Sequence, residues 1–155
     1  MHAAPHEESH KEITPDLLKD FDGFLFGSAT RYGRVSASVS AFFDATGGLW
    51  ATGALHGKFA GLFTSSASQH GGQETTALTT IPYLAHHGIA FVPIGFAASQ
   101  LTDNTEIVGG SAYGAAAIAN GDGSRAVSEK ELEIAAFQGK TFATLINTFA
   151  AGKSA

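Results

Sequence analysis

Two short apolar runs each end in a loop of small and hydroxyl-bearing residues, and this repeated pattern limits the possible folds most. The first run is residues 24–27, followed by a loop to residue 33, and the second is residues 59–63, followed by a loop at 64–73. An uncharged run of this length is typical of a strand buried in a parallel sheet. Because ligands of open α/β sheets bind beyond the carboxyl ends of the strands, we predict a ligand site formed by these two loops.

The first loop concentrates residues that suit a ligand. Thr30 and nearby backbone N–H groups can donate hydrogen bonds, Arg31 can bind an anion, and Tyr32 offers a flat apolar face before Gly33. Considered alone, Arg31 is better explained as a surface salt-bridge residue. The second loop is rich in serine and glycine, and its backbone N–H groups can surround the polar edge of a ligand.

Helical patterns separate and follow the two runs. A hydroxyl residue, a proline and an acid at residues 14–16 predict a short helix, and residues 36–45 carry apolar side chains at helical spacing. A helix at residues 74–87 should bend at Pro82, and residues 89–94 should form a third strand. The alternation predicts an α/β fold, a parallel sheet with helices on both faces.

The last third of the chain is predicted to be a long loop and a final helix. Residues 96–125 show no clear periodicity, and a loop of this length is usually functional or used in assembly. Residues 128–131 form a capping box, which predicts the start of the helix. We expect this helix to bury Leu132, Ala135, Phe142, Leu145, Ile146 and Phe149.

Length and composition exclude several classes of protein. At 155 residues the chain has the length of one domain, expected at residues 14–150 after a disordered tail at 1–13. A net charge of −5 with nine lysines and arginines argues against a nucleic-acid partner. The absence of cysteine, of a long apolar run and of a leader pattern favours a cytoplasmic protein. His2, His6 and His10 could align on a helix, but no apolar face would hold that helix, so no metal site is expected.

Several motifs occur in the order and spacing of a known family. They are Gly27-Ser28-Ala29-Thr30-Arg31-Tyr32-Gly33, Thr46-Gly47-Gly48-Leu49-Trp50-Ala51, Gly71-Gly72-Gln73-Glu74, Leu84-Ala85-His86-His87-Gly88, Tyr113-Gly114-Ala115 and Asp122-Gly123-Ser124-Arg125. From residue 14 onward the chain resembles the WrbA-type NAD(P)H:quinone oxidoreductases, and most closely their fungal branch. The resemblance implies a flavodoxin-like fold, FMN as the bound cofactor, and two-electron transfer from NAD(P)H to a quinone.

The same resemblance implies roles for individual residues. Thr30, Arg31, Tyr32 and Gly33 correspond to the loop that contacts the flavin ring. The second flavin loop corresponds to Ser65, Ser66, Ala67, Ser68, Gln69 and His70. Trp50 resembles the aromatic wall beside the substrate, contributed across a subunit interface, and His86 resembles a histidine that reaches the flavin; these two are the expected catalytic residues. The family forms tetramers, and its fungal members allow peripheral membrane association.

The chain also departs from the family pattern. Ala29 replaces a proline, Ala67 replaces a glycine of the bacterial members, and one residue is inserted near Gln69. The first two strands of the family's sheet and the loop that binds the FMN phosphate have no counterpart, so the strand at residues 24–27 should have an unpaired edge. Two hypotheses follow. The chain is part of a longer quinone oxidoreductase, or it is a non-catalytic flavodoxin-like module that has lost FMN binding and assembles with full-length relatives.

Overall fold

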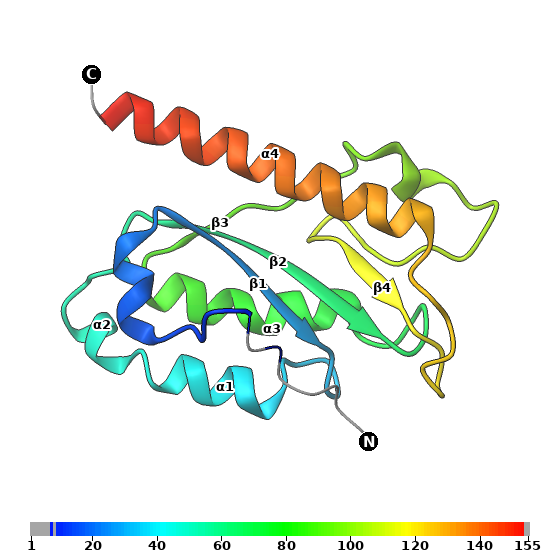
Figure 1. Ribbon diagram of the computed structural model, residues 1–155, viewed down its shortest axis with the longest axis horizontal. Helices are drawn as coiled ribbons and strands as arrows, with labels where there is room; N and C mark the ends of the chain where they lie inside the picture. The colour runs from blue at the N-terminus through cyan, green and yellow to red at the C-terminus, as the bar shows by residue number, and fades with distance from the viewer. Residues whose placement is uncertain (1–6, 8, 154–155) are drawn as a thin grey trace.

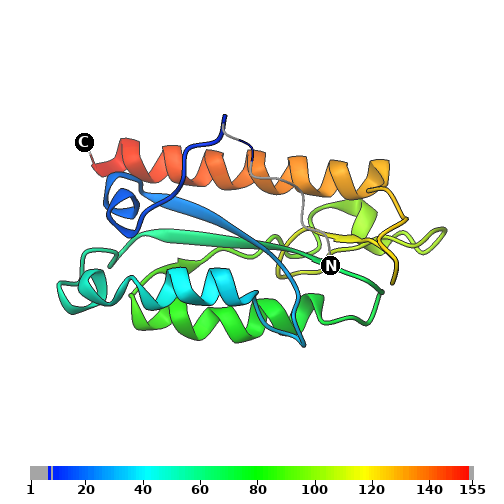
Figure 2. The same ribbon diagram turned by 60° about the horizontal axis from the view of Figure 1, so that its bottom comes forward.

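A parallel sheet lies between two layers of helices (Figure 1). The structure is a computed structural model that describes residue 7 and residues 9–153. Helix α4 (Glu129–Lys153) covers one face of the sheet, and α1 (Ala37–Asp44) and α3 (Gln73–His86) cover the other (Figure 2). The predicted α/β fold with helices on both faces is therefore confirmed.

Most of the predicted disordered tail at residues 1–13 lies outside the described residues. Residues 1–6 and 8, which include His2 and His6, lie outside the described residues. Residues 9–13 contain no helix or strand.

Strand β2 (Phe59–Ser66) is the centre of the sheet. One edge pairs in parallel with β1 (Gly23–Ala29), whose first residue lies opposite Phe59 and whose last lies opposite Ser65. The other edge pairs with β3 (Ala90–Phe91) at its beginning and with β4 (Ala116–Ile118) at its end. Strands β3 and β4 are therefore two pieces of one edge strand, and residues 92–115 are inserted between them.

This interrupted edge differs from the sequence prediction. The strand expected at residues 89–94 is paired only at Ala90–Phe91, because the chain then turns into the insertion. The expected loop at 96–125 contains β4 and a 3-10 turn, η2 (Ser99–Thr102). The residues of β4 are two alanines and one isoleucine, too short a run to be recognised against the alanine-rich sequence around it.

The first two helical segments begin where the sequence predicts, but the first of them is a 3-10 helix rather than an α-helix. The segment η1 (Pro15–Asp20) is a 3-10 helix, and the Thr14 side chain makes no capping hydrogen bond. At the start of α1, the Ser36 hydroxyl accepts a hydrogen bond from the Val39 N–H. A further short helix, α2 (Gly47–Ala51), contains the only tryptophan.

Helix α4 buries a face that is one position away from the predicted one. Its buried residues are Glu131, Ile134, Gln138 and Phe142. Leu132, Ala135 and Leu145 are exposed, Phe149 is more than a third exposed, and of the six expected core residues only Phe142 is fully buried. The prediction followed the apolar residues, whereas the buried face carries two polar side chains that bind backbone groups of the sheet and the insertion.

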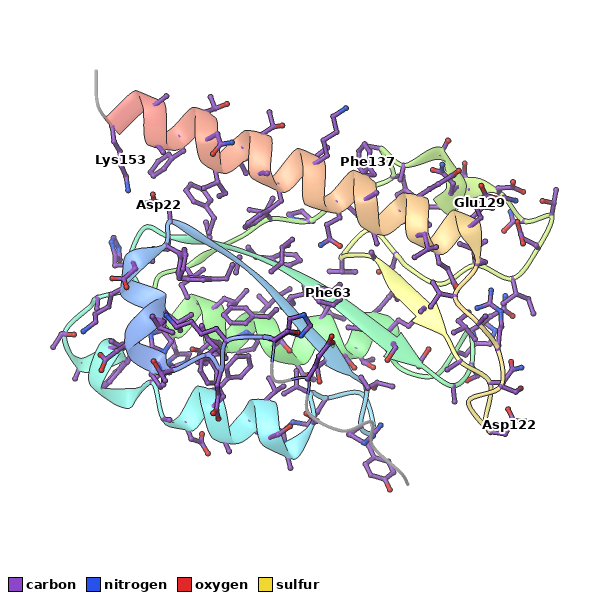
Figure 3. The ribbon with its side chains drawn as sticks, in the orientation of Figure 1. Asp22, Phe63, Asp122, Glu129, Phe137 and Lys153 are labelled. Atoms are coloured by element: carbon purple, nitrogen blue, oxygen red, sulfur yellow. The ribbon has the colours of Figure 1, made fainter. Side chains whose placement is uncertain are left out.

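Both ends of α4 are fixed by polar contacts. The predicted capping box is confirmed, because the Ser128 N–H donates to Glu131 Oε2 at 2.8 Å and the Glu131 N–H donates to the Ser128 hydroxyl at 3.2 Å. Arg125 forms a salt bridge to the buried Glu131 carboxylate at 2.9 Å. At the other end Lys153 pairs with Asp22, just before β1, at 2.9 Å (Figure 3).

The apolar core lies mainly between the sheet and the layer of α1, α2 and α3. It contains Leu18, Phe24, Leu49, Leu55, Ala60, Leu84 and Ile89. Phe42 packs against this cluster, and Phe43 stacks on Tyr83 with ring centroids 3.9 Å apart. A second cluster beneath α4 joins Ile134 to the insertion.

Strand β1 has an open edge. Among the described residues it pairs with β2 alone, as the sequence predicts. Beside this edge lies a groove of about 570 Å³ that is lined by Glu12, Ile13, Leu18, Phe24, Leu25, Phe26, Gly27, Ser38, Val39 and Phe42. The Phe63 ring stands over Gly27 on the face of the sheet that α4 covers only partly, and it is 46% exposed (Figure 3).

Candidate functional site

The first loop is a tight turn at the carboxyl end of β1. The backbone groups of Arg31 and Arg34 exchange hydrogen bonds of 2.7 and 3.0 Å across it. Tyr32 lies at the tip with a φ of 54° and is fully exposed. A bulky residue seldom adopts this backbone region, and such conformations concentrate at ligand sites.

The second loop, at the carboxyl end of β2, presents backbone donors. Its shape is held by the Ser66 hydroxyl, which donates to the Ser68 carbonyl at 2.8 Å, and by the Gly71 N–H, which donates to the same carbonyl at 3.0 Å. Among the described residues, the N–H groups of residues 67–70 have no acceptor. Helix α3 begins directly after this loop without a side-chain cap, so further unpaired N–H groups lie beside it. The loop therefore offers several donors to a ligand with a polar edge.

The two loops lie side by side. The Thr30 N–H donates to the Ser65 carbonyl at 2.8 Å, which extends the pairing of β1 with β2 by one residue. Gly72 has a φ of 103°, and a Cβ atom there would lie 3.0 Å from the Thr30 hydroxyl oxygen and 3.1 Å from Gly33 Cα. Glycine at position 72 thus permits the approach of the first loop to the start of α3.

The side chains of Thr30 and Arg31 are engaged within the loop itself. The Thr30 hydroxyl accepts a hydrogen bond from the Gly33 N–H at 3.2 Å and lies 2.8 Å from the Thr76 hydroxyl of α3. Arg31 donates through Nη1 to the Thr30 carbonyl at 2.9 Å. Thr30 therefore shapes the turn, and Tyr32 is fully exposed at its tip.

A polar pocket of about 370 Å³ adjoins the second loop. It is lined by Gln69, His70, Gly72, Gln73, Glu74, Thr75 and Gly110. Gly110 belongs to the insertion between β3 and β4, so two segments that are distant in sequence form the walls. The predicted loop residues Gln69 and His70 are among those that line it.

Trp50 and His86 lie far from these loops in the same chain. His86 is the last residue of α3, whereas Gln73, beside the loops, is the first. Fourteen residues of α-helix span about 20 Å. Trp50 lies on α2 and is 57% exposed, and His86 is also exposed. One chain therefore brings the two predicted loops together but not Trp50 or His86.

The segment that carries Trp50 is fixed to α3 by the buried His87. His87 Nε2 lies 3.0 Å from the Thr46 hydroxyl, which also lies 3.1 Å from the Tyr83 hydroxyl. Burial lowers the pKa of His87, and the nearby His86 adds to this effect. His87 is the packed member of the histidine pair and His86 the exposed one, as is usual for adjacent positions on a helix.

Three buried polar side chains of α3 and α4 accept hydrogen bonds from backbone N–H groups of the insertion, which no sequence pattern predicts. They are Gln73, Glu131 and Gln138. Gln73 lies inside the motif Gly71-Gly72-Gln73-Glu74, but its contact with Gly110 joins residues that are 37 positions apart in the chain. Among residues 7 and 9–153, no group of three or more His, Asp or Glu side chains is arranged to hold a metal ion.

Comparison with known proteins identifies the family. Residues 3–103 match the family described as NADPH-dependent FMN reductase. The chain belongs to the NADPH-dependent FMN reductase family. It is 51% identical over 144 residues to the P25 protein of Schizosaccharomyces pombe, and 51% identical over 141 residues to the NAD(P)H quinone oxidoreductase PST3 of Candida albicans. These matches cover 92% and 90% of the chain and 71% of each relative.

A solved structure shares the fold. The flavodoxin, WrbA-like protein from Agrobacterium tumefaciens aligns with a TM-score of 0.67 at 23% identity, over 86% of this chain and 71% of that one. The predicted flavodoxin-like architecture is therefore confirmed. No helix in the described part of this family member is long and apolar enough to cross a membrane.

The residues at the two loops fit the ring end of FMN. The unpaired N–H groups of residues 67–70 suit the nitrogen and oxygen atoms along the polar edge of a flavin, and the exposed Tyr32 ring offers a flat apolar contact. Glycines 71 and 72 keep Cβ atoms away from Ser68 and Thr30 at the mouth of the pocket.

Proposed function

We propose that this chain is an FMN-dependent NAD(P)H:quinone oxidoreductase. The observation that carries the proposal is the pair of adjoining loops at the ends of β1 and β2, with their unpaired N–H donors, in a member of the NADPH-dependent FMN reductase family. A relative that is 51% identical is named an NAD(P)H quinone oxidoreductase. Bound FMN would accept a hydride from NAD(P)H and pass two electrons to a quinone.

The roles of the chain's own residues in this proposal are binding and orientation. Tyr32 would contact the flat face of the ring, and the turn shaped by Thr30, Arg31 and Gly33 would hold it there. The second loop, residues 65–70, would donate backbone hydrogen bonds to the ring's polar edge. We place this activity in the cytoplasm, on the absence of cysteine from the sequence.

Trp50 and His86 would act in an assembly of several copies. Both are exposed at the end of the sheet that lies opposite the two loops. They can therefore approach the flavin only from a neighbouring subunit. We therefore propose a homo-oligomer, a tetramer by resemblance, in which Trp50 of one copy forms a wall beside the ring bound by another. An exposed tryptophan is a common anchor of such interfaces.

Titration with FMN tests the proposal, since flavin fluorescence is quenched when the ring stacks in a protein site. We expect quenching by the parent chain and weaker quenching by Gly72→Ala, because the new Cβ meets Thr30 and Gly33 at 3.0–3.1 Å. Gly123→Ala is the matched control: that glycine also has a positive φ, 77°, but open space around it. A chimera that adds the part of the P25 protein without a counterpart here separates two outcomes. Quenching by the chimera alone assigns the activity to the longer form, and quenching by neither rejects it.

The open edge of β1 favours a second candidate function, a non-catalytic module that assembles with a longer relative. The edge is seven residues long, uncharged, and flanked by an apolar groove of about 570 Å³. Such an edge is a template for a further strand. The longer relatives carry residues outside the matched region, and we propose one of their strands as the occupant.

Co-expression with the P25 protein discriminates this candidate. A complex on size exclusion that is lost on Leu25→Lys, a change at a partly exposed position of β1, supports the module. If the chain elutes apart from the relative, as a monodisperse monomer, the module is rejected.

A further inference from the structure

Gln73 joins the second loop to the insertion. It is the first residue of α3, and only 8% of its surface is exposed. Its Oε1 accepts a hydrogen bond from the Gly110 N–H at 2.8 Å, and its Nε2 donates to the Ser66 hydroxyl oxygen at 2.8 Å. Ser66 in turn donates to the Ser68 carbonyl at 2.8 Å. An unbroken chain of hydrogen bonds therefore runs from the insertion, through Gln73, into the loop.

These contacts require an uncharged amide at position 73. The Ser66 proton is directed to the Ser68 carbonyl, so the Ser66 oxygen needs a donor. The Gly110 N–H needs an acceptor. Glutamine supplies both, whereas glutamate supplies only acceptors and an apolar side chain neither. Loss of the amide would leave the buried Ser66 oxygen without a donor and the half-buried Gly110 N–H without an acceptor, which costs more than the hydrogen bonds themselves contribute.

This chain of hydrogen bonds ends beside the backbone donors that we expect to contact the ligand. Gln73 and Gly110 both line the polar pocket of about 370 Å³, which Gln69 and His70 of the second loop also line. The N–H groups of residues 67–70, which are free to meet a ligand, follow directly after Ser66. Any movement of Ser66 relative to the insertion would displace these donors.

We propose that Gln73 is a positioning residue that holds the second loop against the insertion and thereby sets the affinity for the flavin ring. It acts through Ser66 and Gly110 rather than on the ring itself. The inference rests on the proposed function, because it takes the loop donors to be flavin contacts.

The chain contains a matched control for a purely structural role. Gln138 is also a buried glutamine, 3% exposed, with the same pair of contacts: its Oε1 accepts from the Ala115 N–H and its Nε2 donates to the Leu62 carbonyl, both at 2.9 Å. Leu62 precedes Ser66 by four residues, about 13 Å along a strand. Removing Gln138 should therefore disturb stability as much as removing Gln73 but leave the loop donors in place.

The experiment compares the parent, Gln73→Ala, Gln73→Glu and Gln138→Ala by two measurements. Hydrogen exchange of the FMN-free protein reports the order of residues 64–72 and 108–112, and FMN fluorescence reports affinity. We expect both alanine variants to melt at similarly lowered temperatures. Only Gln73→Ala should exchange faster in both segments and bind FMN about tenfold more weakly. Gln73→Glu should resemble it at neutral pH and recover relative to the parent on acidification, when a protonated carboxyl regains a donor.

The inference is overturned if Gln73→Ala binds FMN as the parent does, or if Gln138→Ala loses affinity equally. It is also overturned if exchange in the two segments is unchanged by Gln73→Ala. Absence of quenching by both the parent and the chimera rejects the proposed function instead. Hydrogen exchange then decides alone whether Gln73 holds the loop.

Discussion

Replacement of Glu131 by glutamine should strongly destabilise the fold. The carboxylate is 2% exposed and accepts hydrogen bonds from the N–H groups of Gly109, Ile118 and Ser128 at 2.8–3.1 Å. Arg125 Nη1 lies 2.9 and 3.0 Å from its two oxygens. All of these partners are donors. An amide at this position would place its own N–H₂ group against at least one of them.

The magnitude follows from the loss of charge and of acceptors together. Removing one partner of a buried ion pair costs about 3–5 kcal/mol, because the other charge remains without compensation. Arg125 keeps its hydrogen bond to the Ile118 carbonyl, which supports the lower part of this range. A domain of this size has a total stability of about 5–15 kcal/mol. Glu131→Gln should therefore fold but lie much closer to the unfolding threshold.

Urea-induced unfolding followed by circular dichroism measures the effect. We expect a lower midpoint with an unchanged slope, since the area exposed on unfolding stays the same. Asp16→Asn is the control: it removes an exposed ion pair with Lys19 and should leave the midpoint almost unchanged. A loss below about 1 kcal/mol for Glu131→Gln would refute the reasoning about buried pairs.

The pH dependence gives an independent check. Burial by itself raises the pKa of Glu131, but hydrogen bonds from Ser128, Arg125, Gly109 and Ile118 outweigh it and lower the pKa below its ordinary 4.5. Stability from the carboxylate is therefore complete above pH 4.5 and is lost as the pH falls through the lower pKa of the folded state. Glu131→Gln should lack this part of the acid sensitivity.

Three further changes test other parts of the structure. Burial lowers the pKa of His87 from 6.5, so the parent should lose stability as the pH falls below 6.5 and through the lower pKa of the folded state. His87→Gln should flatten this part of a plot of melting temperature against pH. Gly114→Ala should cost about 1–3 kcal/mol in urea unfolding, since its Cβ would lie 1.9 Å from the Leu62 carbonyl oxygen, whereas Gly121→Ala, with open space around it, should cost far less. Trp50→Ala should leave the melting temperature nearly unchanged, because the side chain is 57% exposed, yet weaken self-association in sedimentation and lower the rate of quinone reduction. Unchanged self-association and an unchanged rate would contradict the interface role.

The elements that the sequence predicts correctly are those with an uninterrupted local signal. Strand β1 contains an apolar run between Gly23 and Gly27, and β2 begins with the apolar run 59–63 shortly after Gly57. The start of α4 is marked by a capping box whose two hydrogen bonds are present. Strand β4 has no such signal, because its pairing with β2 depends on a partner fifty residues away in the chain. The face of α4 is shifted for a related reason: Glu131 and Gln138 are buried by their hydrogen bonds rather than by their hydropathy.

The candidate site likewise contains features with a local sequence signal and features without one. The two loops can be predicted from sequence because a loop that follows a parallel strand necessarily lies at the ligand edge. The role of Gln73 cannot be predicted, since Gly110 is 37 positions away and approaches only when the insertion folds back. The separation of Trp50 and His86 from the loops also has no local signal. It results from the direction of α3, which runs from the ligand edge to the opposite end of the sheet.

The two edges of the sheet differ in a way that limits how copies of the chain can grow into larger structures. One edge is the continuous strand β1, seven residues long. The other consists of β3 and β4, two and three residues long, with the insertion between them. Fibrillar growth by strand addition needs two edges of useful length on every molecule. With one such edge, pairing through the sheet ends once β1 is covered, so a sheet-mediated assembly would be closed and finite rather than fibrous.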